Sequence, residues 1–120
     1  MELTKLEKYK SQFSAFYQQI EGLQNYLSKV EESGYKMIYL DRVSTQLDIP
    51  AIDALFLMSL AEKEHLVKKK LLLFTKEGQY LIGEFNSASE IPSELVDENT
   101  GKKVHEGEYY VDIVFEAPNE

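Results

Sequence analysis

Residues 41–85 place helix, turn, helix and ribbon signals in one order, and few folds can accommodate that order. Val43 and Leu47 lie four residues apart among polar residues, which predicts a short helix with one apolar face. Pro50 cannot continue a preceding helix, but it suits the first turn of a new one. A second and strongly apolar helix is therefore predicted over residues 50–66.

Two β-prone runs follow, over residues 68–75 and 80–85, and a turn signal separates them. Gly78 in this turn would supply the positive φ that a tight hairpin requires. Before the first helix, residues 35–40 form a short apolar run, which predicts a buried strand beside the ribbon. The stretch is thus predicted to hold two helices, an antiparallel ribbon and one short strand.

This pattern resembles the winged helix-turn-helix superfamily over residues 35–85. The resemblance is one of element order and not of a diagnostic motif. It implies that the second helix takes the position of the recognition helix and that the ribbon is the wing. It also implies one of two functions, a module that reads duplex DNA or a winged helix that has become a protein-interaction subunit.

The first 32 residues carry the clearest helical periodicity in the chain. One helix over residues 2–32 would be about 45 Å long, which is more than one winged helix needs for its own core. Either it folds back over residues 35–85 as the first core helix, or its N-terminal half contacts a second chain. We expect the second outcome, and therefore a homo-oligomer, because the apolar residues follow the spacing of a coiled-coil seam. The seam starts with Leu6, Tyr9, Phe13, Phe16 and Ile20 and continues through Leu23, Leu27 and Val30.

The last third of the chain predicts an acidic β extension. Residues 109–115 alternate with the period of a strand, and a turn signal spans residues 97–101. A similar turn at residues 74–78 gives the pair the spacing and trailing glycine of zinc knuckles. The segment thus resembles a zinc ribbon without its cysteines, whose ligand positions hold Phe74, Glu77, Asp97 and Thr100. A plain β-hairpin is the preferred alternative, and neither version would bind zinc because carboxylates and hydroxyls do not replace thiolates at this spacing.

Charge is distributed unevenly along the chain. The formal net charge of −8 argues against nucleic acid or an anionic membrane as the partner. Residues 36–76, however, carry seven basic and five acidic side chains, whereas residues 77–120 carry two basic and eleven acidic ones. The absence of cysteine excludes disulfides, thiol catalysis and thiolate metal sites. With no secretion signal and no apolar run of about 20 residues, we expect a soluble cytoplasmic protein without a membrane segment.

Catalysis is not expected. His65 and His105 are the only histidines, and neither lies in a metal-ligand spacing such as HExxH. Glycine-rich phosphate loops and nucleophile elbows are missing as well. No catalytic residue, cofactor site or metal site is therefore predicted.

Duplex DNA binding is one of two functional hypotheses, with the chain acting as a dimeric transcriptional regulator. It would place the second helix in the major groove, with Ser44, Thr45 and Gln46 near the DNA backbone. Lysines of the wing would contact phosphates. These are Lys68, Lys69, Lys70 and Lys76.

Protein interaction is the hypothesis we favour, with the chain as a non-catalytic adaptor or subunit of a larger complex. A helix that reads base edges needs Arg, Asn, Gln or Lys on its outer face, but residues 51–61 are apolar nearly all round. Such a helix needs cover from the N-terminal helix or from another chain. We expect Ile52, Phe56 and Leu60 to be its partner contacts.

These features together predict an α+β fold with three parts. Residues 1–34 form a long amphipathic helix, residues 35–85 a winged helix-turn-helix, and residues 86–120 a C-terminal antiparallel β extension.

Overall fold

The computed structural model describes residues 1–76 and 79–117, and it confirms a mixed α+β fold. The backbone divides into two compact units. The helical unit comprises Met1–Lys68 together with the chain from Phe115 onward, and the β unit comprises Lys69–Val114.

The N-terminal segment forms four helical pieces and not one rod. They are η1 (Leu3–Leu6), α1 (Glu7–Gln12), η2 (Ser14–Phe16) and α2 (Tyr17–Ser33). The break lies at Phe13, whose backbone leaves the helical region at φ −123° and ψ 65°. The prediction of one helix over residues 2–32 is therefore wrong.

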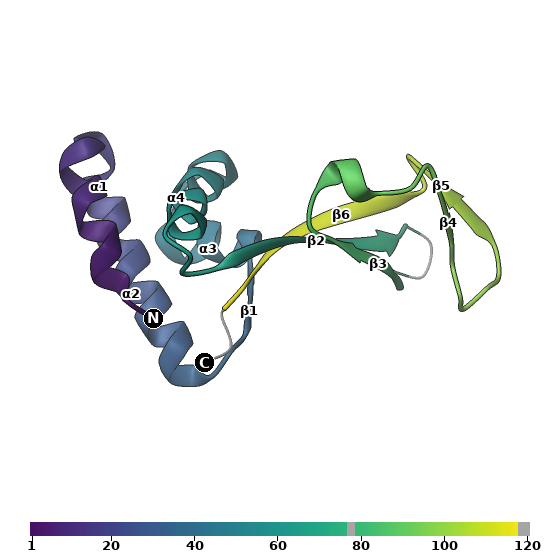
Figure 1. Cartoon of the computed structure of the whole chain (residues 1–120), viewed down its shortest axis with the longest axis horizontal. Helices are drawn as coiled ribbons and strands as arrows, with labels where there is room; N and C mark the ends of the chain where they lie inside the picture. The colour runs from purple at the N-terminus through teal and green to yellow at the C-terminus, as the bar shows by residue number, and fades with distance from the viewer. Residues whose placement is uncertain (77–78, 118–120) are drawn as a thin grey trace. The chain divides into compact units, whose positions relative to one another are not determined.

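Beyond this break, α1 folds back beside α2 (Figure 1). The amino group of Met1 pairs with Glu31, and the side chain of Gln24 donates a hydrogen bond of 3.0 Å to the carbonyl of Leu3. Both halves of the apolar stripe are thereby removed from water within one chain. Each buried large apolar side chain contributes about 1.5–3 kcal/mol, which outweighs the few helical hydrogen bonds that the break removes.

Two helices lie where the sequence predicted them, over residues 41–47 and 50–66. α3 (Leu40–Leu47) and α4 (Ala51–Lys63) meet at an angle of 109°. This value lies within the range of helix-turn-helix pairs. Gly22 of α2 permits the close approach of α3, because an added Cβ would lie only 3.1 Å from Leu47 Cδ2. A glycine inside the apolar stripe, which costs a helix about 1 kcal/mol, is explained by this contact.

Within the described part of the chain, six strands form two sheets. The four-stranded sheet has the order β1 (Met37–Tyr39), β6 (Tyr109–Glu116), β2 (Lys68–Thr75) and β3 (Leu81–Phe85). The predicted ribbon is confirmed, since β2 pairs antiparallel with β3 from Leu71↔Phe85 to Phe74↔Leu81. Gly78, to which we assigned the turn, lies outside the described residues.

The expected position of β1 beside the ribbon is wrong. β6 from the C-terminal third lies between β1 and β2, and the amide of Ala117 donates to the carbonyl of Lys36 at 2.8 Å. Local sequence could not reveal this arrangement, because any β-prone run can pair with the free backbone N–H and C=O groups at the edge of a sheet. The last described residues therefore pair with the strand β1 and belong to the helical unit.

β4 (Glu94–Val96) and β5 (Lys103–His105) form a separate two-stranded hairpin, after a short helix η3 (Ala88–Glu90). Asp97 is buried at its turn and accepts hydrogen bonds from the amides of Thr100 and Gly101 at 3.2 and 2.7 Å through its carbonyl. This segment is an antiparallel hairpin, a geometry that both alternatives share.

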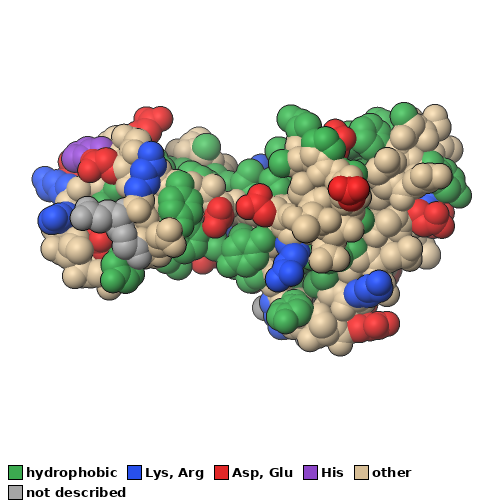
Figure 2. All heavy atoms as spheres, turned by 180° about the vertical axis from the view of Figure 1, so that it is seen from behind, with side chains coloured by type: hydrophobic (Ala, Val, Ile, Leu, Met, Phe, Trp, Pro, Cys, Tyr) green, Lys and Arg blue, Asp and Glu red, His purple; other side chains and the backbone are tan. Residues whose placement is uncertain are grey.

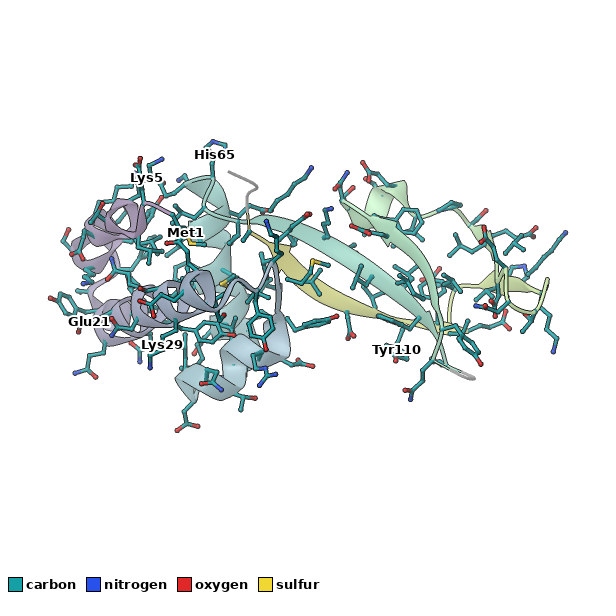
Figure 3. All side chains as sticks on the ribbon, turned by 90° about the horizontal axis from the view of Figure 1, so that it is seen from below. Met1, Lys5, Glu21, Lys29, His65 and Tyr110 are labelled. Carbon is teal, nitrogen blue, oxygen red and sulfur yellow. The ribbon has the colours of Figure 1, made fainter. Side chains whose placement is uncertain are left out.

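The other proposed knuckle is partly outside the described residues, because it includes Glu77. Phe74 lies in β2 and stacks on Tyr110 at 5.6 Å between ring centroids, and Figure 3 labels Tyr110 in the β unit. An aromatic side chain packed in a sheet is an ordinary core position. No part of the observed geometry at Phe74 or Asp97 requires descent from a zinc ribbon.

In the described part of the chain, no single helix is both long and apolar enough to cross a bilayer. Only α3 and α4 taken together reach that length and composition, across their bend of 109°.

Candidate partner-binding groove

The predicted oligomer seam lies against the chain's own helices. Leu6, Tyr9 and Ile20 are each no more than 2% exposed. Phe13 and Phe16 are half-buried, and their ring centroids lie 5.2 and 5.1 Å from that of Phe56 in α4. The surplus of apolar surface that motivated the seam is therefore absent in this fold, while oligomerisation itself stays a prediction.

Of the three contacts expected on the second helix, only Ile52 is open. Leu60 is 7% exposed and Phe56 is covered by the N-terminal aromatic residues, whereas Ile52 is 75% exposed. The cover that the apolar helix needed thus comes from the N-terminal segment, which was one of the two options.

A hydrogen bond and an ion pair to Glu64 connect the N-terminal segment to the end of α4. The hydroxyl of buried Tyr9 donates to a carboxylate oxygen of Glu64, and Lys8 pairs with the other oxygen at 2.8 Å. The hydrogen bond to Glu64 raises the pKa of Tyr9 to about 12. In turn, hydrogen bonds from Lys8 and Tyr9 lower the pKa of Glu64.

The side chains expected near a DNA backbone are mostly engaged elsewhere. The hydroxyl of Ser44 donates to the carbonyl of Ile49 at 2.6 Å, and that of Thr45 donates to the carbonyl of Asp41 at 2.9 Å. Gln46 is exposed and lines the groove described below. These hydroxyls satisfy the backbone around the turn instead of presenting free donors.

The predicted phosphate contacts are not a uniform cationic patch. Lys70 forms an ion pair of 2.9 Å with Glu84, and Lys69 is half-buried, while Lys68 and Lys76 are exposed. On the face drawn in Figure 2, basic and acidic side chains are interspersed and no broad basic field is visible. Phosphate recognition along a duplex relies on such a field.

A groove large enough for a ligand lies in the helical unit. It has a volume of about 480 Å³ and is bounded by the C-terminal half of α2, by β1 and by α3. Pockets of this size are typical of small-molecule and peptide sites. The side chains that give it its chemistry are Tyr26, Lys29, Tyr35, Met37, Tyr39 and Arg42.

The burial predicted for residues 35–40 is wrong, and this error hid the groove. Only Ile38 faces the core at 2% exposure, whereas Tyr35 is 71%, Met37 36% and Tyr39 45% exposed. In a strand successive side chains point to opposite faces, so a three-residue strand with one core residue must present its two neighbours outward. A run of uniformly apolar letters could not show which face was covered.

The groove is cationic in a chain that is acidic overall. Its described lining includes Lys29 and Arg42 but no acidic side chain, and Figure 3 labels Lys29 on α2. Neither cation forms an ion pair with any residue in 1–76 or 79–117. Burial raises the pKa of Tyr26, while the nearby charge of Arg42 acts in the opposite direction.

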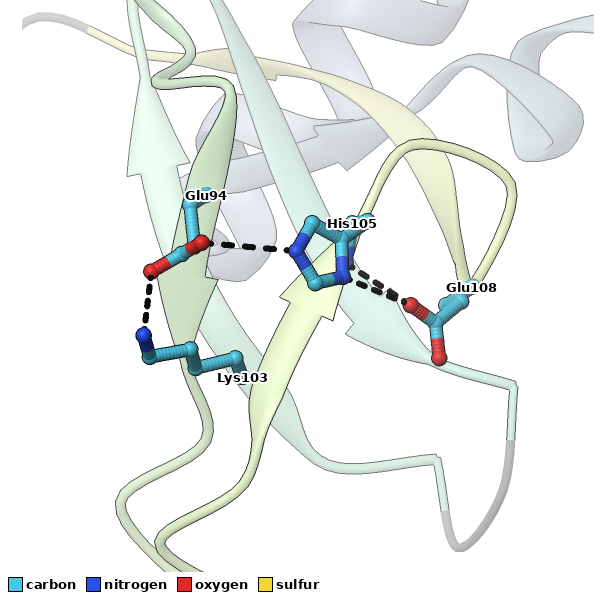
Figure 4. Close-up of polar contacts among 4 residues, drawn as sticks. All are labelled: Glu94, Lys103, His105 and Glu108. Carbon is cyan, nitrogen blue, oxygen red and sulfur yellow. Dashed lines mark hydrogen bonds and ion pairs between the residues drawn. The ribbon is translucent and has the colours of Figure 1, made fainter.

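A second polar cluster lies on the β4–β5 hairpin and the turn that follows it (Figure 4). His105 Nδ1 lies 3.1 Å from Glu108 and its Nε2 lies 3.4 Å from Glu94, which also pairs with Lys103 at 3.2 Å. All four side chains are well exposed, and exposed ion pairs contribute little to stability. Among the described residues no three His, Asp or Glu side chains are arranged to hold a metal ion. We therefore treat this cluster as surface pairing.

Comparison with protein-family models, with curated proteins and with solved structures finds no match to this chain. Function must therefore be argued from the geometry alone.

Proposed function

We propose that this chain is a non-catalytic protein-interaction module of the winged-helix type, which acts within a larger complex or as a homo-oligomer. The observation that carries the proposal is the surface of α4. In the position of a recognition helix, its exposed side chains over residues 51–61 are Ala51, Ile52 and Ser59, and Phe13 and Phe16 cover a neighbouring face.

This surface is poorly suited to base recognition. Base edges are read by bidentate Arg, Lys, Asn or Gln side chains, and residues 51–61 contain none of these. The hydroxyl of Ser59 is hydrogen-bonded to the carbonyl of Phe56 within the helix. Removing the exposed Ile52 from water against a partner protein would instead stabilise a complex.

Duplex DNA binding is the second candidate, as a dimeric regulator. The angle of 109° between α3 and α4 and the exposed Lys68 and Lys76 favour it. Against it, the chain carries a net charge of −8, which repels phosphate at long range.

Fluorescence anisotropy with mixed-sequence and promoter duplexes at two salt concentrations separates the two candidates. The interaction module predicts negligible affinity at physiological salt, and no further change when Lys68, Lys69 and Lys70 are replaced by Gln. Tight, salt-sensitive binding would establish the DNA-binding candidate instead, provided that the triple replacement weakens it. The salt slope should then fall by about one for each lysine that had been bound to a phosphate.

The α4 surface is tested by Ile52→Glu in a pull-down of co-purifying proteins. We expect loss of the partner with the helical circular dichroism unchanged, because Ile52 is 75% exposed and contributes little to the core. Leu60→Glu is the contrasting variant. It should unfold the chain, since Leu60 is buried.

A further inference from the structure

We propose that the groove lined by Tyr26, Lys29, Tyr35, Met37, Tyr39 and Arg42 binds a short acidic segment of a partner protein. The inference rests on the proposed interaction function and names the partner's chemistry. It concerns a surface distinct from the exposed residues of α4.

Charge complementarity identifies the occupant. Lys29 and Arg42 are exposed, line one groove, and have no carboxylate beside them in its described lining. Neither cation forms an ion pair among the described residues, so both are available to a partner's carboxylates. A carboxylate brought by a partner would pair with the planar guanidinium of Arg42 through two parallel hydrogen bonds.

The aromatic side chains determine what else the partner must bring. Tyr35, Met37 and Tyr39 expose between a third and three quarters of their surface, although each has a large apolar body. Tyrosine and methionine are enriched in protein interfaces, because they supply contact area and adapt to the partner's shape. The bound segment should therefore carry apolar or aromatic side chains between its acidic ones.

The openness of the lining favours a peptide over an enclosed small molecule. Small-molecule sites usually bury most of the ligand, whereas Tyr35 at 71% exposure forms an outer wall and not a lid. A peptide segment can enter such a groove with two or three side chains and leave its backbone partly in water.

Nucleic acid fits the same groove less well. A single strand brings one negative charge with each nucleotide, and its binding requires a continuous cationic track. The groove offers only Lys29 and Arg42 in its described lining, within a chain of net charge −8. A peptide can place one or two carboxylates against these two cations and present no further charge.

Selection of a displayed random 12-residue peptide library on the whole chain tests the inference. The enriched peptides should contain Asp or Glu together with aromatic or large aliphatic residues. Their affinity is then measured for the wild type, for K29Q/R42Q, and for K63Q as the matched control. Lys63 is an exposed lysine of α4 that does not line the groove.

The double variant should weaken binding about tenfold or more, since hydrogen bonds to charged groups contribute about 1.5–3 kcal/mol. The affinity of K63Q should stay within about twofold of the wild type, because dissolved salt screens an exposed charge that lies far from the ligand. Both variants should keep the wild-type circular dichroism, as each replaces exposed side chains. Amide shifts on titration should change around Tyr26 and Tyr39.

Any one of the following results would overturn the inference. They are no enrichment, enrichment without acidic residues, equal weakening by K63Q and K29Q/R42Q, and tighter binding of labelled oligothymidylate through Lys29 and Arg42. Salt-sensitive self-association abolished by K29Q/R42Q would make the occupant a second copy of this chain, which also rejects a separate partner. If Ile52→Glu alone abolishes partner capture and K29Q/R42Q does not, the interaction function stands and only this inference fails.

Discussion

The helical unit and the β unit are stabilised in different ways. Most described side chains that are fully buried and apolar belong to the helical unit, on η1, α1, α2, α3, α4, β1 and the end of β6. The β unit contributes only Leu71, Leu72, Leu73, Val104 and Val114 to the described core. Packing should therefore dominate the stability of the helical unit, and strand pairing that of the β unit.

The contrast extends to charged groups. In the helical unit, Glu64 joins a buried tyrosine to a lysine and so links the N-terminal segment to α4. In the β unit, Glu94, His105 and Glu108 pair in the open on one hairpin. The contacts of Glu64 thus join segments that are distant in the sequence, whereas those of Glu94, His105 and Glu108 join one hairpin and the turn after it at the surface.

The largest expected effect is on the helical core. Leu27→Ala should lower the free energy of unfolding by about 2–5 kcal/mol, because Leu27 is fully buried on α2. Val104→Ala in the β4–β5 hairpin should cost about 1.5 kcal/mol, from two methyl groups at about 0.8 kcal/mol each. Urea unfolding followed by circular dichroism measures both. An equal loss in the two variants would abolish the contrast between the units.

A smaller effect is expected at the aromatic contact between the N-terminal segment and α4. Phe13→Ala should cost about 1–3 kcal/mol, because it removes buried surface and the edge-on contact with Phe56. Ile52→Ala, on the exposed side of α4, should change stability by no more than about 0.5 kcal/mol. Urea unfolding measures both variants, and a larger loss from Ile52→Ala than from Phe13→Ala would contradict this assignment of the two faces.

Light scattering coupled to size exclusion, run on the same Phe13→Ala sample, addresses the predicted oligomer. If Phe13 acts within one chain, the mass of the variant should equal that of the wild type. Conversion of a wild-type dimer to a monomer, with little loss of monomer stability, would return Phe13 to an intermolecular seam.

The hydrogen bond between Tyr9 and Glu64 is expected to make the free energy of unfolding depend on pH, with a more modest effect. A lowered folded pKa means that the contribution of Glu64 is present above its unfolded pKa, about 4.3, and is lost as the pH falls through the folded value. A raised folded pKa means that the contribution of Tyr9 is present below its unfolded pKa, about 10, and is lost as the pH rises toward about 12.

Tyr9→Phe should accordingly destabilise the chain most between these limits and progressively less on either side. Urea midpoints at a series of pH values measure this profile, and an ultraviolet titration should lose one late-titrating tyrosine. Tyr35→Phe is the matched control, since Tyr35 is largely exposed. The same profile in both variants would show that the hydroxyl of Tyr9 contributes nothing specific.

The smallest effect is expected at the exposed hairpin cluster. Hydrogen bonds from the backbone amide and the imidazole of His105 lower the pKa of Glu108. His105→Ala removes the imidazole donor and should move that pKa partly back toward its ordinary value, in an NMR titration of the Glu108 carboxyl. The unfolding midpoint should hardly change. A large shift would mean that this cluster stabilises the β unit, as the hydrogen bond between Tyr9 and Glu64 stabilises the helical unit.

Local pattern was sufficient for most of the elements. The spacing of Val43 and Leu47, the position of Pro50 and the alternation over residues 109–115 predicted α3, the start of α4 and β6 within a few residues of their observed bounds. These signals work because helix and strand periods are properties of neighbouring residues.

The candidate site was largely missed. Of its six characteristic residues, the strand prediction included Tyr35, Met37 and Tyr39 but assigned them to the core. Lys29 and Arg42 lie on separate helices, so their approach depends on how α2 and α3 pack. The sequence offered one signal, which is that Ile38 stands between Met37 and Tyr39. Treating this run as a strand with one buried face would have placed Ile38 in the core and its two neighbours outside.

The amino-acid sequence by itself determined the α+β class, the positions of α3, α4, β2, β3 and β6, and the need to cover an apolar α4. Only the tertiary structure decided what covers it, where β6 pairs and which side chains of β1 face water. The physical reason is that burial is not directional. The apolar stripe gains nearly the same free energy when it packs against its own chain as when it packs against a second one. The interruption of the helix at Phe13 decides between them, because it lets α1 pack beside α2.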